Sequence, residues 1–265
     1  MILRAAYMRV GYYVTLAFFG AFGLALSFCC LLCGGLPPTN RTERFFQRRI
    51  HQNFSLFIWW IDFARLVQVR FHDLSRLTVG RTGCVFVSNH PSLIDITCLL
   101  ARVPEAICIF KPAIRRNPVL GAAARRAGYL ASDGGFEVLR QAAEKVTAGH
   151  NLVVFPEGTR TPVGEKLLPF KPGFVLLARR AGSPLQLVRF VYSHPPLAKG
   201  CPWWVPPHVS TKVDITIGPR LEVAAEANIA AAATEIERWF RATPEAAACQ
   251  VWSPAFRVSE RSDPA

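Results

Sequence analysis

The feature that most constrains this chain is a long uncharged stretch near its N-terminus. No Asp, Glu, Lys or Arg occurs from Val10 to Asn40. Within this stretch, Tyr12–Leu32 is apolar and long enough, at 1.5 Å per residue, for one helix to cross a hydrocarbon core of about 30 Å. Tyr12 and Tyr13 stand at one end as interfacial aromatic residues. We therefore expect residues 1–40 to form an N-terminal transmembrane or re-entrant anchor.

The residues that flank this stretch predict where the helix ends and how it is oriented. Gly34–Gly35 and Pro37–Pro38 break a helix. Two arginines, Arg4 and Arg9, precede the stretch, and a larger group follows it: Arg41, Arg44, Arg48 and Arg49. Because positive charge stays on the cytoplasmic side of a membrane helix, we expect an inner (cytoplasmic) membrane location, with the rest of the chain facing the cytoplasm.

The stretch has two other interpretations. Gly20 and Gly23 lie in its middle, so a re-entrant or in-plane helix pair is an open variant. A cleaved signal peptide is disfavoured, because the stretch is long for one and no convincing small-residue cleavage site precedes Pro37.

Residues 41–66 are expected to form a second helical segment at the membrane interface. Its Phe54–Phe63 portion is too rich in Phe and Trp for an ordinary surface helix. Such a helix either lies in the interface with its rings at headgroup level or covers the core of the following domain. The sequence leaves both alternatives open.

The charge balance favours an anionic partner. The chain has 31 basic and 18 acidic residues, a formal net charge of +13. We expect this partner to be membrane phospholipid and not nucleic acid, because the sequence has no zinc-ligand spacing, RNP-like sequence or basic helix. The cysteines have mainly apolar neighbours and no metal-binding spacing, so we expect no metal site.

From about residue 67, short strand-like runs alternate with helical stretches. The predicted strands are Val67–Phe71, Cys84–Ser88, Leu152–Phe155, Leu185–Val191 and Val213–Ile217. The predicted helices are Leu93–Ala101, Pro118–Arg126, Phe136–Ala148, Pro172–Ala181 and Ile229–Phe240, the last with Asn228 as its N-cap. This alternation predicts an α/β domain over residues 67–245, with a mixed, largely parallel sheet flanked by helices and ligands at the carboxyl ends of the strands. We expect residues 246–265 to be a C-terminal tail, which is polar and frayed after Pro254.

A possible acid–base pair follows one of these strands. His90 lies at the end of the apolar run Cys84–Ser88, and Asp95 lies five residues later, where a helix is expected to begin. Across such a corner the carboxylate can hold one imidazole nitrogen and leave the other free to accept a proton. The structural alternative is an Asp that caps the helix beside a His with no chemical role.

A second group of polar residues follows the strand Leu152–Phe155. The sequence continues Pro-Glu157-Gly158-Thr159-Arg160. Gly158 allows a ligand to approach the backbone closely, and the planar guanidinium of Arg160 suits a phosphate. We expect the amides at Gly158–Thr159 to contribute to anion binding. The alternative is that Glu157 and Arg160 pair with each other and only hold the loop.

Together, Asn-His-x4-Asp ending at Asp95 and Phe-Pro-Glu-Gly-Thr-Arg ending at Arg160 resemble the glycerolipid acyltransferase family, which includes the 1-acylglycerol-3-phosphate acyltransferases. The resemblance extends from about Leu77 to Val191 and includes the segments Lys111–Gly128 and Phe170–Gly173. It implies that His90 is the general base and that Asp95 orients it. It also implies an acceptor and phosphate site that contains Glu157, Gly158, Thr159, Arg160 and Lys171.

The resemblance further implies transfer of a fatty acyl group from an acyl-CoA or acyl-carrier-protein thioester to the free hydroxyl of a lyso-lipid acceptor, 1-acyl-sn-glycerol-3-phosphate. A thioester is already activated, so no cofactor is expected. Gly134 stands where the family has an arginine that helps hold the acceptor phosphate, and Leu187 stands where it has a proline. A different acceptor, such as a lyso-aminolipid, is therefore the first alternative. A non-catalytic membrane or acyl-carrier binding protein is the second, and the intact His90–Asp95 pair disfavours it.

Overall fold

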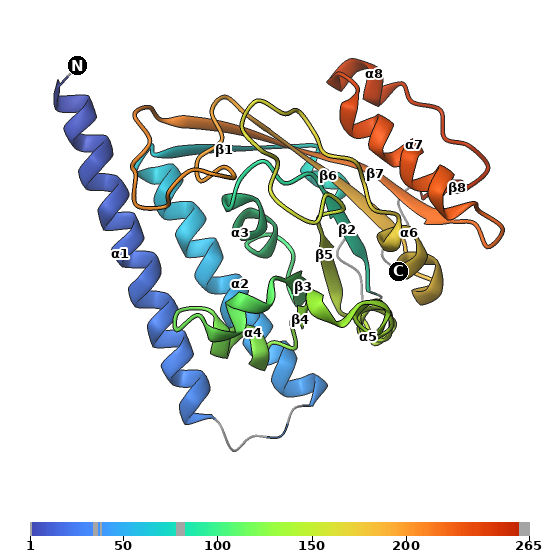
Figure 1. Cartoon of the computed structure of the whole chain (residues 1–265), viewed down its shortest axis with the longest axis horizontal. Helices are drawn as coiled ribbons and strands as arrows, with labels where there is room; N and C mark the ends of the chain where they lie inside the picture. Colours follow the sequence, from blue (N-terminus) through green and yellow to red (C-terminus); the bar gives the residue numbers. More distant parts are fainter. Residues whose placement is uncertain (1, 34–36, 38, 78–82, 260–265) are drawn as a thin grey trace.

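The computed structural model describes residues 2–33, 37, 39–77 and 83–259, which form a central sheet with helices on both faces (Figure 1). Within these residues the sheet has eight strands, in the order β1-β7-β6-β2-β5-β3-β4, with β8 paired to β7. The strands are β1 (Val67–His72), β2 (Val85–Ser88), β3 (Ala106–Phe110), β4 (Leu130–Ala131), β5 (Asn151–Val154), β6 (Leu185–Tyr192), β7 (Thr211–Val223) and β8 (Phe256–Val258). The predicted α/β class is confirmed.

Most neighbouring strands run parallel, as the sequence predicts. β2 lies between β5 and β6 and is parallel to both, and β3 is parallel to β5 and β4. β7 is antiparallel to β6 and β8 and parallel to β1. The carboxyl ends of β2, β5 and β6 therefore meet at one edge of the sheet, which is where open α/β sheets bind their ligands.

The strands separate two hydrophobic cores. Val85 and Val87 of β2 belong to one core and Phe86 to the other, as the two-residue period of a strand requires. Helices α5, α6 and α7 cover the first core, and α2, α3 and α4 cover the second. The helices after the first are α2 (Asn40–Phe63), α3 (Ile94–Leu100), α4 (Gly121–Arg126), α5 (Phe136–Thr147), α6 (Gly173–Ala181), α7 (Ile229–Arg241) and α8 (Pro244–Ala248), with 3-10 turns η1 (Leu74–Arg76), η2 (Pro112–Arg116) and η3 (Ser132–Gly134).

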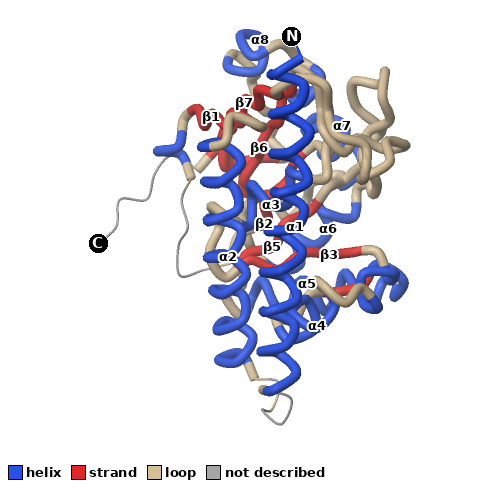
Figure 2. The backbone as a smooth tube through the Cα atoms, turned by 90° about the vertical axis from the view of Figure 1, so that its left-hand side faces the viewer, coloured by secondary structure: helices blue, strands red, loops and turns tan. Residues whose placement is uncertain are grey.

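The first helix, α1 (Ile2–Leu32), lies beside α2 on the outside of the second helical layer (Figure 2). Within the described residues it is the helix that is long and apolar enough to cross a membrane, with a mean hydropathy of 2.1 over Leu3–Leu32. The residues expected to end it, Gly34–Gly35 and Pro38, lie outside the described part of the chain.

Polar contacts fasten α1 to the domain. The indole Nε1 of Trp60 in α2 donates a hydrogen bond to the Thr15 hydroxyl at 3.0 Å. The Ser27 hydroxyl donates to the Val119 carbonyl, just before α4, at 2.9 Å. The anchor helix is thus a packed part of the domain.

Helix α2 covers the core with one face and exposes aromatic rings on the other. Phe46 and Ile61 are buried in the second core, whereas Trp59 and Phe63 are 58% and 67% exposed. The inner face of α2 therefore covers the core of the domain, which was one of the two alternatives for residues 41–66. The outer face keeps the composition of an interfacial helix.

The C-terminal segment departs from its prediction. The expectation of a frayed tail is wrong for the described residues up to 259, because Phe256 of β8 is buried in the first core and pairs with Val223 of β7. Helix α8 also continues across the expected boundary at residue 245. The N-cap at Asn228 is confirmed, since its side chain accepts hydrogen bonds from the amides of Ala230 and Ala231.

The packing of α1 can be tested at two glycines. A Cβ on Gly23 would lie 2.1 Å from Val119 Cγ1 and 3.0 Å from the Val119 carbonyl oxygen, whereas a Cβ on Gly20 has no heavy atom within 4 Å. We predict that Gly23→Ala lowers the free energy of unfolding by about 1–3 kcal/mol, because α1 must move away from Val119. Gly20→Ala should leave it unchanged or raise it by up to about 1 kcal/mol through helix propensity. Thermal unfolding of the detergent-solubilised chain measures both, and equal midpoints would contradict the docking of α1 at Val119.

Candidate active site

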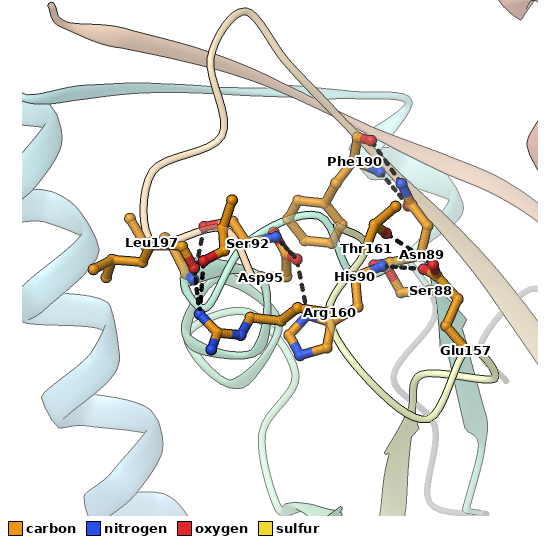
Figure 3. Close-up of polar contacts among 12 residues, drawn as sticks. Ser88, Asn89, His90, Ser92, Asp95, Glu157, Arg160, Thr161, Phe190 and Leu197 are labelled. Carbon is orange, nitrogen blue, oxygen red and sulfur yellow. Dashed lines mark hydrogen bonds and ion pairs between the residues drawn. The ribbon is translucent and has the colours of Figure 1, made fainter. Parts of the chain in front are cut away.

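The two predicted polar loops meet at the carboxyl edge of the sheet. One follows β2 and carries His90, and the other follows β5 and carries Glu157–Arg160. β2 and β5 are neighbouring parallel strands, with Val87 opposite Val154. Figure 3 shows the side chains of both loops converging above this edge. The sheet topology therefore brings His90 and Glu157, which are 67 positions apart in the sequence, into one site.

His90 and Asp95 form the predicted pair. His90 Nδ1 lies 3.0 Å from Asp95 Oδ2, and the Asp95 side chain is fully buried. The same oxygen accepts a hydrogen bond from the Ser92 amide at 2.8 Å. A carboxylate that accepts the Nδ1 proton leaves Nε2 as the nitrogen that can take a proton from a ligand. The imidazole also stacks on the Phe155 ring, with the ring centroids 4.0 Å apart, and this contact holds its plane.

A residue that the sequence did not predict completes this pair. The Tyr192 hydroxyl, at the end of β6, donates a hydrogen bond of 2.6 Å to Asp95 Oδ1. Burial raises the pKa of Tyr192 well above its ordinary value, so the phenol stays protonated and donates. Burial likewise raises the pKa of Asp95, and the hydrogen bonds from His90, Tyr192 and Ser92 oppose that rise. Both carboxylate oxygens are thus held by donors, which fixes their orientation toward His90.

Glu157 joins the two loops to each other. Its Oε1 accepts a hydrogen bond from the His90 amide at 2.7 Å, and its Oε2 accepts from the Thr161 hydroxyl at 2.8 Å and the Leu168 amide at 2.9 Å. The Thr161 amide in turn donates to the His90 carbonyl at 2.8 Å. Glu157 is only 4% exposed. Its carboxylate shapes the site from within the protein, and the predicted alternative of a Glu157–Arg160 pair is not what holds the loop.

The turn at Gly158 depends on glycine. Its φ is +69°, a left-handed conformation that residues with a Cβ adopt at a cost. Its amide donates to the Phe155 carbonyl at 2.9 Å, so the expectation that this amide binds an anion is wrong. Lys171 lies beside the turn, because a Cβ on Gly158 would be 3.2 Å from Lys171 Nζ. Lys171 is exposed.

Arg160 connects the site to a distant loop. Its Nη1 donates to the carbonyl oxygens of Leu197 and Ala198 (Figure 3). Its guanidinium is partly exposed and contributes to the wall of a cavity. One nitrogen is thus used to position the side chain beside the space that a ligand would enter.

The cavity has a volume of about 470 Å³ and lies between the polar loops and the first two helices. Its polar lining includes His90, Thr159, Arg160 and Lys111. Most of its surface is apolar, and the side chains that α1 and α2 contribute include Phe19, Phe22, Leu26, Phe54 and Phe57. Lys111 was not predicted to belong to the site, although it directly follows the end of β3 at the same edge of the sheet. The shape and lining suit a ligand with an anionic head and a long hydrocarbon chain.

A family model described as Acyltransferase matches residues 68–191 of the chain. Among curated proteins, the chain is similar to a 1-acyl-sn-glycerol-3-phosphate acyltransferase of Helicobacter pylori, with 39% identity over 41% of this chain and 48% of that protein. It is also similar to the human 1-acyl-sn-glycerol-3-phosphate acyltransferase beta, with 33% identity over 72% of this chain and 66% of that one. A lyso-ornithine lipid O-acyltransferase of Pseudomonas aeruginosa is 34% identical over 51% of this chain and 52% of its own length.

The matched region spans about half the length of the first of these curated relatives. Among solved structures, the crystal structure of a 1-acyl-sn-glycerophosphate acyltransferase from Thermotoga maritima has a TM-score of 0.67 at 22% identity. That match covers 95% of this chain and 98% of the other. It establishes the shared fold, including the N-terminal helices.

The role of Glu157 in joining the loops gives a stability prediction. Glu157→Gln keeps the size of the side chain but replaces one accepting oxygen by an amide that cannot accept from the Leu168 or His90 amide. We predict a loss of about 1–3 kcal/mol in the free energy of unfolding, the cost of leaving a buried donor without its acceptor. Glu165→Gln is the matched control, because Glu165 lies in the same loop and is exposed. Chemical denaturation measures both, and equal midpoints for the two variants would contradict this role.

Proposed function

Because the chain belongs to the acyltransferase family, we propose that it transfers a fatty acyl group from a thioester donor to the free hydroxyl of 1-acyl-sn-glycerol-3-phosphate. The donor in this proposal is acyl-CoA or acyl-carrier protein. The observation that carries the proposal is the position of His90, held by buried Asp95 and lining a mostly apolar cavity together with Arg160 and Lys111. The reaction requires a general base, a cation that binds the acceptor phosphate, and an apolar cavity that holds an acyl chain.

His90 acts as the general base in the proposed reaction. Its Nε2 takes the proton from the acceptor hydroxyl while the hydroxyl oxygen attacks the thioester carbonyl carbon. The resulting tetrahedral intermediate collapses, the carbon–sulfur bond breaks, and the thiolate leaves with the proton that His90 returns. Asp95 stabilises the imidazolium while His90 carries that proton. A thioester is activated enough that this sequence uses no metal or cofactor.

Arg160 and Lys111 are the proposed partners of the acceptor phosphate. Both line the cavity that His90 lines, and they come from the loops after β5 and β3. A guanidinium and an ammonium hold a phosphate by charge-assisted hydrogen bonds. Glu157, Gly158 and Thr159 then shape the loop that presents Arg160, and Lys171 adds positive charge beside Gly158.

The contacts of α1 support a shallow membrane position for this site. The Tyr7 hydroxyl near one end of α1 donates to the Ala64 carbonyl at 2.7 Å, and near the other end the Arg126 guanidinium donates to the Cys33 carbonyl at 2.5 Å. A helix fastened at both ends to one globular domain cannot cross a bilayer without carrying that domain into it. We therefore favour the re-entrant or in-plane arrangement, on the cytoplasmic face of the inner membrane, where thioester donors are available.

A second acceptor class has specific support. Gly134 lies in η3 beside Ser132, which lines the cavity, so an arginine is missing close to the proposed phosphate site. One of the similar curated proteins is named a lyso-ornithine lipid O-acyltransferase. The alternative function is acylation of such a lyso-aminolipid, which carries no phosphate.

The catalytic proposal predicts that His90→Ala abolishes acyl transfer while the protein still folds and binds membranes. The loss should be about 10²–10⁴-fold, the typical contribution of a general base. Asp95→Asn should also lower turnover, because an amide does not enforce the Nδ1–H tautomer. Purified protein is given labelled acyl-CoA or acyl-carrier protein with a panel of lyso-lipids, and products are measured by mass spectrometry. Wild-type turnover in His90→Ala would refute the mechanism.

The acceptor is tested by restoring the missing arginine. The backbone of Gly134 is not left-handed, unlike that of Gly135, but a Cβ on Gly134 would lie 2.7 Å from Val138 Cγ2. Gly134→Arg is therefore combined with Val138→Ala, and Val138→Ala alone is the control. We predict a lower KM for 1-acyl-sn-glycerol-3-phosphate, corresponding to about 1.5–3 kcal/mol for a charge-assisted contact. No gain in a variant with an unchanged melting temperature, together with a wild-type preference for an acceptor without phosphate, would support the lyso-aminolipid instead.

A further inference from the structure

The connection between β6 and β7, residues Ser193–Ser210, runs from the active site to α1, and we call it the strap. At one end, the Ser92 hydroxyl donates to the Pro196 carbonyl and Arg160 donates to the Leu197 carbonyl. Farther along, the hydroxyls of Tyr12 and Tyr13 in α1 donate to the backbone of the strap. In Figure 1 the strap is the orange loop beside the N-terminal half of α1.

The part of the strap that reaches α1 is rigid and exposes large apolar side chains. Trp203, Trp204 and Val205, which we call the strap tip, are 60%, 58% and 49% exposed. Pro202 precedes them and Pro206–Pro207 follows, which restricts the backbone on both sides. The hydroxyls of Tyr12 and Tyr13 donate hydrogen bonds to the backbone carbonyl oxygens of Trp203 and Trp204, so these contacts do not involve the indole rings. The backbone is therefore fixed while the two indoles face outward.

Exposed tryptophans on a restrained loop are costly to leave in water and are typical of membrane interfaces. The strap tip adjoins the helix that is apolar enough to enter a bilayer. Around the Tyr12 and Tyr13 contacts, α1 itself exposes Val10, Tyr13 and Val14, so both the helix and the strap expose apolar side chains where they are hydrogen-bonded to each other.

We propose that the strap tip is a membrane contact additional to the two N-terminal helices, with the indoles of Trp203 and Trp204 inserted at the headgroup level of a phospholipid bilayer. This inference rests on the proposed function, because it assigns the surface from which a lipid acceptor reaches the site. The strap that carries the tip also accepts the hydrogen bond from Arg160. Insertion of the strap tip into the membrane–water interface would thus hold Arg160 at the depth of the phosphate headgroups.

The test compares one acceptor in two physical forms. The full-length variant Trp203→Ala/Trp204→Ala is assayed with the lyso-lipid acceptor embedded in vesicles of phosphatidylcholine and phosphatidylglycerol, and with the same acceptor dispersed in detergent. We predict that kcat/KM on vesicles falls about tenfold, equivalent to about 1.4 kcal/mol of lost interfacial burial, while the value in detergent is unchanged. Phe136→Ala is the control, because Phe136 is 83% exposed on α5 and should leave both values unchanged.

Two outcomes of this assay would overturn the proposal. An unchanged ratio of vesicle to detergent activity would show that the indoles contribute no membrane contact. An equal loss in both forms would assign them a structural role only. A melting temperature measured in detergent distinguishes that loss from unfolding.

A second measurement does not depend on activity, so it separates this proposal from the proposed function. Cys201 is exposed and lies two residues before Trp203, whereas Cys249 is exposed near α8. With Cys29, Cys33 and Cys249 changed to Ser, an environment-sensitive dye on Cys201 should shift to the blue on reconstitution into the same vesicles. The matched label on Cys249, with Cys29, Cys33 and Cys201 changed to Ser, should not shift. Absence of a shift at Cys201 would refute insertion of the strap tip. A shift in a chain that acylates no lyso-lipid would support insertion and would refute the proposed function.

Discussion

The hydrogen bond from the His90 amide to the Glu157 carboxylate is the interaction on which the site depends. It joins the loops that follow two adjacent parallel strands, and a carboxylate buried at this position is stable only while all of its donors are present. The imidazole on one loop and the guanidinium on the other are then held at a fixed separation. The geometry of the site is therefore a property of the strand pair β2–β5.

The second constraint is the position of α1. Its side chains form part of the cavity wall opposite His90, and contacts near both ends fasten it to the domain. The apolar helix and the polar side chains of the site therefore pack as one unit. Under the proposed function, a water-insoluble substrate does not have to leave the bilayer completely to reach the site, because the wall of the cavity is itself the apolar helix.

The parts of this structure that local sequence determines were predictable, and the parts that distant contacts determine were not. His90 and Asp95 are five residues apart at one strand-to-helix corner, so their pairing could be inferred from the sequence. Tyr192 joins them only because β6 pairs with β2, which no local pattern indicates. The strand β8 was missed for the same reason, since a three-residue strand with one buried ring, Phe256, forms only by pairing with the distant strand β7.

The reversal of direction between β6 and β7 has an evolutionary consequence. Because β7 is antiparallel to β6, the connection between them leaves and re-enters the sheet at the catalytic edge, whereas a parallel pair would require a crossover to the opposite edge. Between its contacts with Arg160 at Leu197 and Ala198 and the start of β7, a segment connected in this way can lengthen, shorten or change composition without altering strand register. Under the proposal that the strap tip contacts a membrane, the way the protein meets a lipid surface can therefore change in this one connection while His90 and Asp95 stay in place.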